Sequence, residues 1–276
     1  MMKKYNYLKI ENIIIVSLVV FILILLILFY MFDSKNISVQ KHLTKIYYNS
    51  ILLKKQFNYL INNNCNIKQE NNLFILNNFL NPKFHDFLKN QFYNKNFESK
   101  NVILRKGSGL NFFNLHNNKN NYNGFLELYY SIELLNILSK IIQKPIQRTP
   151  LSDDNACSLL IYSKKGDYID WHKDYSSYYG DRYVVLLTII NENSSKNDLS
   201  NNKFCYMYNS KEYEIKIQPN TLIIFKGSEI YHKSTSIDEN ELRILLSMTF
   251  CDICQEKKNI INYSYEKIKN LIIYNN

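Results

Sequence analysis

Glycine and proline are scarce in this 276-residue chain, which contains only 6 and 4 of them, while asparagine, isoleucine, lysine and tyrosine are heavily used. This bias is typical of an AT-rich coding sequence and indicates no particular function. Gly107 and Gly109 mark a turn. The turn lacks the longer glycine pattern ending in lysine and serine or threonine, which excludes a nucleotide-phosphate loop there. The chain also contains no internal repeats.

Cysteine is limited to five residues, namely Cys65, Cys157, Cys205, Cys251 and Cys254. This odd number gives no disulfide framework, and it fits a reducing compartment as well as a partly oxidised lumen. Cys251 and Cys254 form a single CxxC pair, and the lack of a second pair excludes a four-cysteine zinc site. We expect the pair to pack at the end of a strand, with a disulfide or redox role as the alternative.

Acidic residues are outnumbered, because 34 lysines and arginines face 24 aspartates and glutamates, for a formal net charge of +10. Such a balance can favour an anionic surface or an acidic substrate. The basic residues are scattered along the chain rather than clustered. A solvated surface is therefore the favoured interpretation of the charge.

One long hydrophobic run is present, at residues 13–32, and it contains no charged residue. Its length matches the ~20 residues that cross a hydrocarbon core as a helix. The run is longer than the apolar part of a signal peptide and ends in bulky residues rather than a cleavage site. We therefore expect a short tail at residues 1–12 and a single-pass transmembrane signal anchor. Lysines flank the run on both sides, so the positive-inside rule barely distinguishes its two possible orientations in the membrane. We favour the orientation that places the folded domain in the lumen of the endoplasmic reticulum or secretory pathway.

The rest of the chain divides into a polar stalk at residues 33–72, one folded domain at residues 73–254, and a C-terminal helix or tail at residues 255–276. Asn81 and Pro82 predict the cap and first position of a helix near the start of the domain. Apolar residues at helical spacing predict a further amphipathic helix over residues 125–142.

Two histidines and an aspartate form the most informative pattern in the sequence. His172 and Asp174 are two residues apart in an extended segment, so their side chains point the same way and can hold one ion. His232 follows the apolar residues 221–225, which are typical of a buried strand. Two imidazoles and one carboxylate on one face leave a metal's other positions open, which suits non-haem Fe(II) that must also bind a co-substrate and oxygen.

Arg243 lies at the start of another strand-like run, residues 243–250. Its planar guanidinium is suited to holding a carboxylate through two hydrogen bonds. The alternative is that these residues have no functional role, so that His172 and His232 are ordinary histidines and Arg243 is a surface charge. That interpretation leaves their order along the chain unexplained.

Taken together, these motifs resemble a known family. The order is Tyr162, His172-Lys-Asp174, Pro-Asn-Thr-Leu-Ile-Ile-Phe at residues 219–225, His232 and Arg243. It resembles the Fe(II)/2-oxoglutarate-dependent dioxygenases, most nearly the prolyl 4-hydroxylase-like branch, over residues 73–251. The chain departs from that branch at residues 201–203, where Asn-Asn-Lys replaces a Gly-Gly-Glu-like turn that many members carry.

The resemblance implies a mainly-β fold with flanking helices (α+β), a double-stranded β-helix of the jelly-roll, cupin type. It implies that His172, Asp174 and His232 are the metal-binding and catalytic residues for Fe(II), with 2-oxoglutarate and O2 as co-substrates and ascorbate as a candidate reductant. Arg243 would then pair with the distal carboxylate of 2-oxoglutarate. Tyr162 would donate a hydrogen bond to the same carboxylate, although packing is the alternative role in a chain with 23 tyrosines.

The loop after the metal pair is polar and aromatic, and it is suited to lining a substrate or closing over it. The residues that we expect there are Tyr175, Tyr178, Tyr179 and Arg182. The resembled branch and the anchor favour a peptidyl proline or lysine as the substrate, with a lipid or small molecule as an alternative.

Nucleic-acid demethylation is a further alternative, but it is disfavoured. Thr249 stands where that branch carries a second arginine. A non-enzymatic hypothesis is that the chain is a catalytically inactive, membrane-tethered binding or scaffold protein. The presence of all four site side chains argues against it. The sequence leaves the oligomeric state open.

Overall fold

The computed structural model describes residues 2–62, 64–93, 95–102, 104–117 and 122–257. The chain divides into two units, residues 1–44 and a unit that begins at Lys45. Most of the C-terminal helix or tail expected at residues 255–276 lies outside the described residues.

The first unit belongs to the long helix α1 (Met2–Phe57), which includes the expected N-terminal tail. Side chains are described from residue 13 to residue 28, whereas those of residues 29–39 are not. Within the described part of the chain, no helix is both long enough and apolar enough to cross a membrane. The transmembrane segment expected at residues 13–32 is thus not found there.

The second unit begins within the segment expected to be a polar stalk. Ile46 and Ser50 are buried, and the ring of Tyr47 lies 5.6 Å from that of Tyr130. Further along, β1 (Asn66–Glu70) pairs with β2 (Leu73–Asn77). Because these residues pack and pair with the rest of the unit, folded structure starts well before the expected boundary at residue 73.

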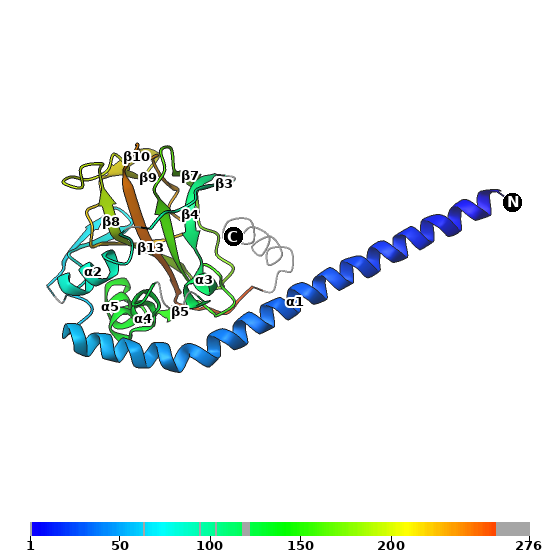
Figure 1. Ribbon diagram of the computed structural model, residues 1–276, viewed down its shortest axis with the longest axis horizontal. Coiled ribbons are helices and arrows are strands. Elements are labelled where there is room, and N and C mark those ends of the chain that lie inside the picture. The colour runs from blue at the N-terminus through cyan, green and yellow to red at the C-terminus, as the bar shows by residue number, and fades with distance from the viewer. Residues whose placement is uncertain (1, 63, 94, 103, 118–121, 258–276) are drawn as a thin grey trace. The chain divides into compact units, whose positions relative to one another are not determined.

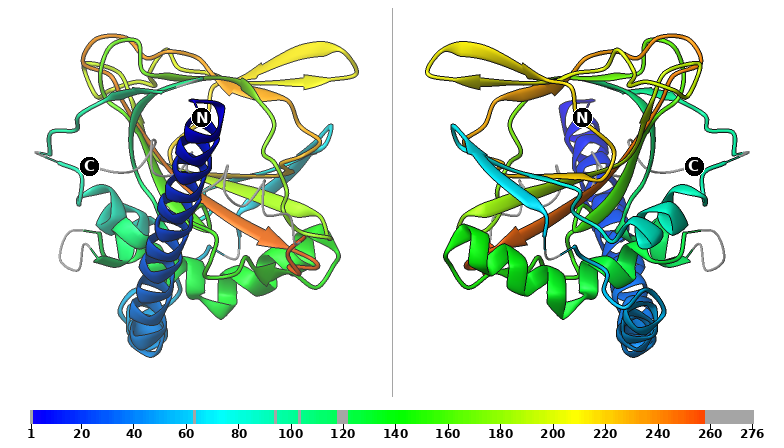
Figure 2. Two further views of the ribbon diagram at one scale, coloured as in Figure 1. Left: turned by 90° about the vertical axis from the view of Figure 1, so that its right-hand side faces the viewer. Right: turned by 90° about the vertical axis from the view of Figure 1, so that its left-hand side faces the viewer.

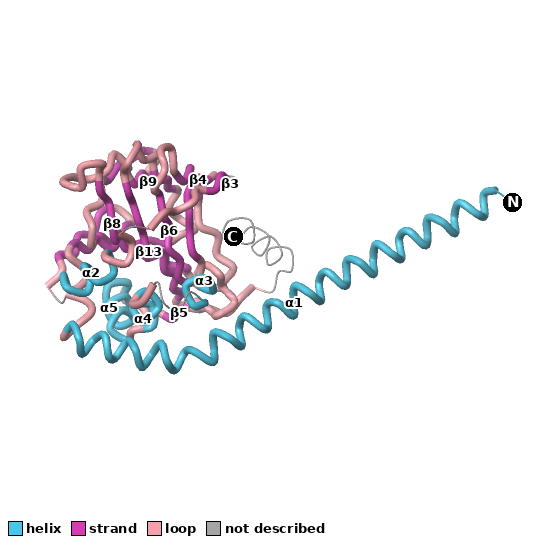
Figure 3. Tube along the Cα trace, viewed as in Figure 1, coloured by secondary structure: helices cyan, strands magenta, loops and turns pink. Residues whose placement is uncertain are grey.

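Thirteen strands of the described residues form a curled antiparallel sheet (Figures 1 and 3). After β1 and β2 they are β3 (Lys100–Val102), β4 (Arg105–Leu110), β5 (Gln147–Arg148), β6 (Cys157–Tyr162), β7 (Tyr168–His172), β8 (Arg182–Glu192), β9 (Phe204–Tyr208), β10 (Lys211–Ile215), β11 (Thr221–Lys226), β12 (His232–Ser234) and β13 (Leu242–Cys251).

The curl brings two layers of strands face to face (Figure 2). One layer has the order β1-β2-β11-β8-β13-β6, and the other has the order β7-β12-β9-β10. Strand β4 pairs with both β6 and β7 and so joins the two layers. This mainly-β arrangement is consistent with the expected jelly-roll domain.

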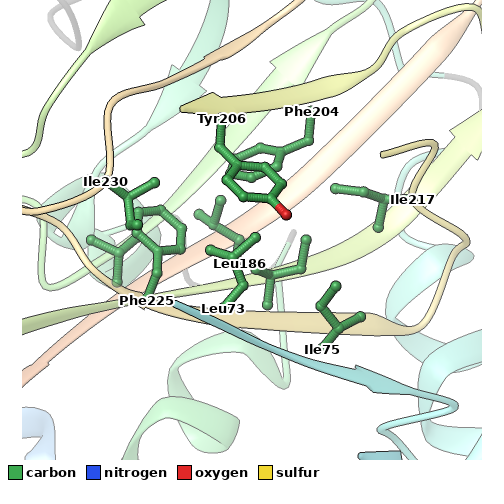
Figure 4. Close-up of a cluster of buried hydrophobic side chains, with 10 residues drawn as sticks. Leu73, Ile75, Leu186, Phe204, Tyr206, Ile217, Phe225 and Ile230 are labelled. Atoms are coloured by element: carbon green, nitrogen blue, oxygen red, sulfur yellow. The ribbon is translucent and has the colours of Figure 1, made fainter. Parts of the chain in front are cut away.

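A hydrophobic cluster fills one end of the space between the layers (Figure 4). Leu73, Leu186 and Phe225 come from the first layer, and Phe204 and Tyr206 come from β9 in the second. Each fully buried side chain of this kind contributes about 1.5–3 kcal/mol through removal of apolar surface from water. The packing fixes the separation of the layers, and with it the width of the space at the other end.

After α1, the described residues of this unit contain four short helices: α2 (Pro82–Lys89), α3 (Phe112–Asn117), α4 (Phe125–Tyr130) and α5 (Ile132–Ile142). The expected cap of α2 is confirmed, since Asn81 accepts a hydrogen bond from the backbone of Lys83 at 2.9 Å. The single helix expected at residues 125–142 is wrong in detail. Ser131 is extended between α4 and α5, and its hydroxyl accepts a hydrogen bond from the backbone of Leu134, which starts a new helix.

Strand β13 ends at Cys251, which forms a disulfide with Cys254. The expectation of packing alone is therefore corrected in favour of the alternative. The chain then runs along the loop that follows β7, where the backbone N–H of Tyr179 donates to the carbonyl of Gln255 and the backbone N–H of Lys257 donates to that of Ser177.

Candidate active site

The three predicted metal ligands come together where β7 ends and β12 begins. His172 ends β7 and His232 begins β12, and the two residues are direct partners across these strands. Asp174 follows β7, and its backbone N–H donates to the carbonyl of Gly227 at 3.0 Å. Gly227 is needed for this approach, because a Cβ atom there would lie 2.8 Å from Cβ of Asp174 and 2.9 Å from Val184.

The ligand atoms of these side chains converge on one point. Nε2 of His172 lies 3.8 Å from Oδ1 of Asp174, and Nε2 of His232 lies 3.7 Å from Oδ2 of the same carboxylate. All three ligand atoms lie within 4.8 Å of one another. Separations of this size suit a single ion with nitrogen and oxygen ligands at about 2 Å.

Hydrogen bonds orient both imidazoles for metal binding. Nδ1 of His172 lies 2.7 Å from the carbonyl of Asp170, and Nδ1 of His232 lies 3.1 Å from the carbonyl of Ile230. A carbonyl can only accept, so each Nδ1 carries the proton and each Nε2 presents a lone pair. Burial lowers the pKa of His232 below its usual value, which favours the neutral form that binds metal.

A cavity of about 310 Å³ adjoins the three ligands. His172, Asp174 and His232 line it from the second layer, while Tyr162 on β6 and Arg243 on β13 line it from the first. The cavity therefore brings the metal ligands and the predicted co-substrate residues into one space.

Arg243 is 1% exposed and has no acidic partner among the described residues. One guanidinium nitrogen donates to the hydroxyl of Ser234, and Nε has no hydrogen-bond partner. Burial lowers the pKa of Arg243 to about 10. A buried cation in this state is costly unless an anion pairs with it, so the site fits a carboxylate-bearing ligand. Tyr162 is the cross-strand partner of Arg243, and its ring centre lies 5.7 Å from the guanidinium carbon.

The four loop residues expected near the substrate separate into two groups. Tyr175 and Arg182 line the cavity. Tyr178 does not fit the expected lid, because it is 1% exposed and donates a hydrogen bond to Asp153 at 2.9 Å. Tyr179 is 62% exposed and lies outside the cavity wall.

Several polar residues of the wall were missed by the sequence analysis. They are Arg105, Asn155, Ser158, Ser234 and Ser247. Side chains that are two or four residues apart in a strand lie on the same face. Ser158 lies four residues before Tyr162, and Ser247 lies four residues after Arg243, so this alternation could have predicted both serines as lining residues. Arg105 carried no such signal, since β4 was not predicted.

Comparisons with solved structures concern the fold of the chain and not its site residues. A non-haem α-ketoglutarate-dependent epimerase from nogalamycin biosynthesis matches with a TM-score of 0.51 and 7% identity, over 70% of this chain and 83% of that one. A 2OG-Fe(II) oxygenase family oxidoreductase from Burkholderia pseudomallei matches with a TM-score of 0.49 and 11% identity, over 68% of this chain and 89% of that one. A prolyl hydroxylase from Trichoplax adhaerens, in complex with a peptide fragment of hypoxia-inducible factor, matches with a TM-score of 0.47 and 16% identity, over 76% of this chain and 92% of that one.

No family model matches the chain, and no curated protein matches it in sequence. The epimerase is the one of these three with a TM-score above 0.5, and at 7% identity its likeness shows the fold alone. The chain has the fold of the 2-oxoglutarate- and Fe(II)-dependent oxygenases, as the order of its motif residues indicated. A His-Asp-His group of the kind that binds Fe(II) is present within it.

Proposed function

We propose that this chain is an Fe(II)- and 2-oxoglutarate-dependent dioxygenase that hydroxylates a C–H bond and releases succinate and CO2. One observation carries the proposal. One cavity contains three converging metal ligands and, on its opposite wall, the buried guanidinium of Arg243, which has no acidic partner among the described residues. A metal site alone would not need Arg243, and a structural arginine would normally have an acidic partner.

The residues of the chain divide the work between them. His172, Asp174 and His232 hold the metal, and Arg243 with Tyr162 holds the distal carboxylate of the co-substrate. Leu160 and Leu245, two positions along the strands from Tyr162 and Arg243, add apolar surface to the cavity wall and limit the entry of water. When bound, Fe(II) with 2-oxoglutarate and O2 supplies the oxidation of the substrate C–H bond, and ascorbate serves as an external reductant.

The substrate that we favour is a peptidyl proline or lysine. This preference rests on the order of the motif residues, which resembles the prolyl 4-hydroxylase-like branch. A small molecule is the second candidate, supported by the limited cavity volume of about 310 Å³ and by the likeness to an epimerase of nogalamycin biosynthesis. Nucleic-acid demethylation remains disfavoured because the second arginine of that branch is replaced by Thr249.

We also propose that residues 13–32 anchor the enzyme in a membrane of the secretory pathway, with the catalytic domain in the lumen. The support is the uncharged run of the sequence, which lies within the continuous helix α1. Fractionation of cells that express the full chain tests this. Extraction from membranes by alkaline carbonate, rather than by detergent alone, would contradict the anchor.

Metal-dependent binding of 2-oxoglutarate tests the proposed chemistry most simply. Calorimetry with the Zn(II)-loaded full chain should give one molecule of 2-oxoglutarate per protein, and no binding after the metal is removed by a chelator. Ser195→Ala, on an exposed loop, is the control variant and should bind normally. Equal binding with and without metal would contradict the assignment of this cavity.

A further inference from the structure

The inward side chains of β6 and β13 change character along the cavity. At one end Arg243 faces Tyr162 across the two strands, and in the next inward positions Leu245 faces Leu160. Two residues further along, Ser247 faces Ser158. Ser247 is four residues from Arg243, or roughly 13 Å along the strand. The cavity thus has a second polar region, which is separate from the residues assigned to the co-substrate.

The hydroxyls of this second region have no hydrogen-bond partner among the residues that the structure describes. Ser158 is 2% exposed, and Ser247 is half-buried. Both residues line the cavity, and neither hydroxyl forms a hydrogen bond with a described residue. Both hydroxyls are open to the cavity rather than enclosed by protein, and apolar residues fill the inward positions just before them. A pair of such hydroxyls in a cavity wall therefore points to a polar group of a ligand.

The charge of the cavity indicates the sign of that group. Five cationic residues line it: Arg105, Lys173, Arg182, Lys233 and Arg243. Asp174 is the one carboxylate among the described lining residues, and it is a metal ligand. Two of the cations have acidic partners outside the wall, since Arg182 pairs with Asp153 at 3.7 Å and Lys233 pairs with Glu212 at 3.1 Å. The wall still has a positive excess, which concentrates anions in a low-dielectric cleft.

We propose that Ser158 and Ser247 form a subsite for an anionic group, a carboxylate or a phosphate, of the primary substrate. The inference rests on the proposed function and names the class of substrate that the site accepts. The two hydroxyls donate hydrogen bonds to oxygens of the anion, and the cationic wall favours its charge. An acidic peptide and a free small acid share this chemistry.

Calorimetry with matched acid and amide pairs tests the proposal. The full chain is loaded with Zn(II) and 2-oxoglutarate, so that binding is measured without turnover. The probes are N-acetylproline and its amide, a Glu-Pro-Gly peptide and its Gln-Pro-Gly counterpart, both with blocked termini, and phosphoserine and serine. The first pair represents small acids, the second acidic peptides and the third phosphates. The double variant Ser158→Ala/Ser247→Ala tests the subsite, each single variant guards against misfolding of the double, and Ser195→Ala is the control.

We expect at least one acid to bind about tenfold or more tightly than its neutral counterpart. In the double variant its affinity should fall by about 10- to 100-fold, as expected for lost hydrogen bonds to a charged group. Binding of 2-oxoglutarate should stay unchanged. If no acid binds more tightly than its neutral counterpart, the inference is overturned. A preference for the acid that survives in Ser158→Ala, in Ser247→Ala and in the double variant also overturns it. Failure of 2-oxoglutarate to bind the metal-loaded wild type would instead refute the proposed function.

Discussion

Replacement of Arg243 by methionine separates the functional role of this residue from a structural one. Burial lowers the pKa of Arg243 from its usual value to about 10. At about 1.4 kcal/mol per pKa unit, the charged form costs the folded state roughly 3 kcal/mol. Because the folded pKa lies below the unfolded one, this penalty is full below about pH 10 and disappears as the pH rises from the folded pKa to the usual pKa of arginine.

Methionine removes this penalty and fills a similar space, but it loses the hydrogen bond to Ser234, which is worth about 1.5–3 kcal/mol for a charged donor. We therefore expect Arg243→Met without ligands to be as stable as the wild type or more stable by up to about 2 kcal/mol. For a domain of this size, that difference raises the melting temperature by at most about 8 °C. Affinity for 2-oxoglutarate should fall by roughly 100-fold or more, because a buried charge pair is lost.

Thermal unfolding with and without Zn(II) and 2-oxoglutarate measures both effects in one experiment. At a ligand concentration of 100 times its Kd, the wild type gains about 2.7 kcal/mol, and the variant should gain almost nothing at the same concentration. A variant that unfolds more than about 5 °C below the wild type, yet retains the shift with 2-oxoglutarate, would refute the reasoning. It would make Arg243 a structural residue.

Three further predictions concern the metal ligands, the glycine beside them and the disulfide. Asp174→Ala should lose bound metal, measured by elemental analysis, while its circular dichroism spectrum stays that of the wild type; a full metal content would refute the site. Gly227→Ala should displace Asp174 and weaken metal binding by about 10- to 100-fold, so unchanged metal affinity in a titration would show that the backbone yields. Cys251→Ser should lower the free energy of unfolding by roughly 2 kcal/mol, the value for a very short closed loop, and should abolish the effect of dithiothreitol on urea unfolding. A wild type insensitive to dithiothreitol would argue against the disulfide.

The metal site could be predicted from the sequence because its logic is local. His172 and Asp174 share a side of one extended segment, and His232 follows an apolar strand, so spacing and alternation were enough to single them out. The strand pairing then places His232 directly opposite His172. The chemistry of Arg243 predicts that it binds a carboxylate, and the structure adds that it is buried and has no acidic partner among the described residues.

Other features depend on contacts that no local pattern records. Tyr178 lies in a polar loop, yet the distant Asp153 accepts its hydroxyl hydrogen bond and draws the ring into the interior. Ser131 fits an amphipathic pattern, but its side chain caps a new helix instead of continuing the old one. The packing of Tyr47 against Tyr130 likewise joins the expected stalk to the folded unit. In each case tertiary packing overrode a reasonable local preference.

Release of succinate from 2-oxoglutarate tests the central claim most directly. The full chain is incubated with Fe(II), ascorbate, O2 and the prolyl and acidic probes described above, beside an Asp174→Ala control. We predict succinate that depends on iron and is absent from the control, and that rises when an accepted substrate is added. Equal succinate release by the wild type and Asp174→Ala would contradict the account. So would a folded wild type that binds both iron and 2-oxoglutarate but releases no succinate with any probe, and this result would favour a binding or scaffold protein.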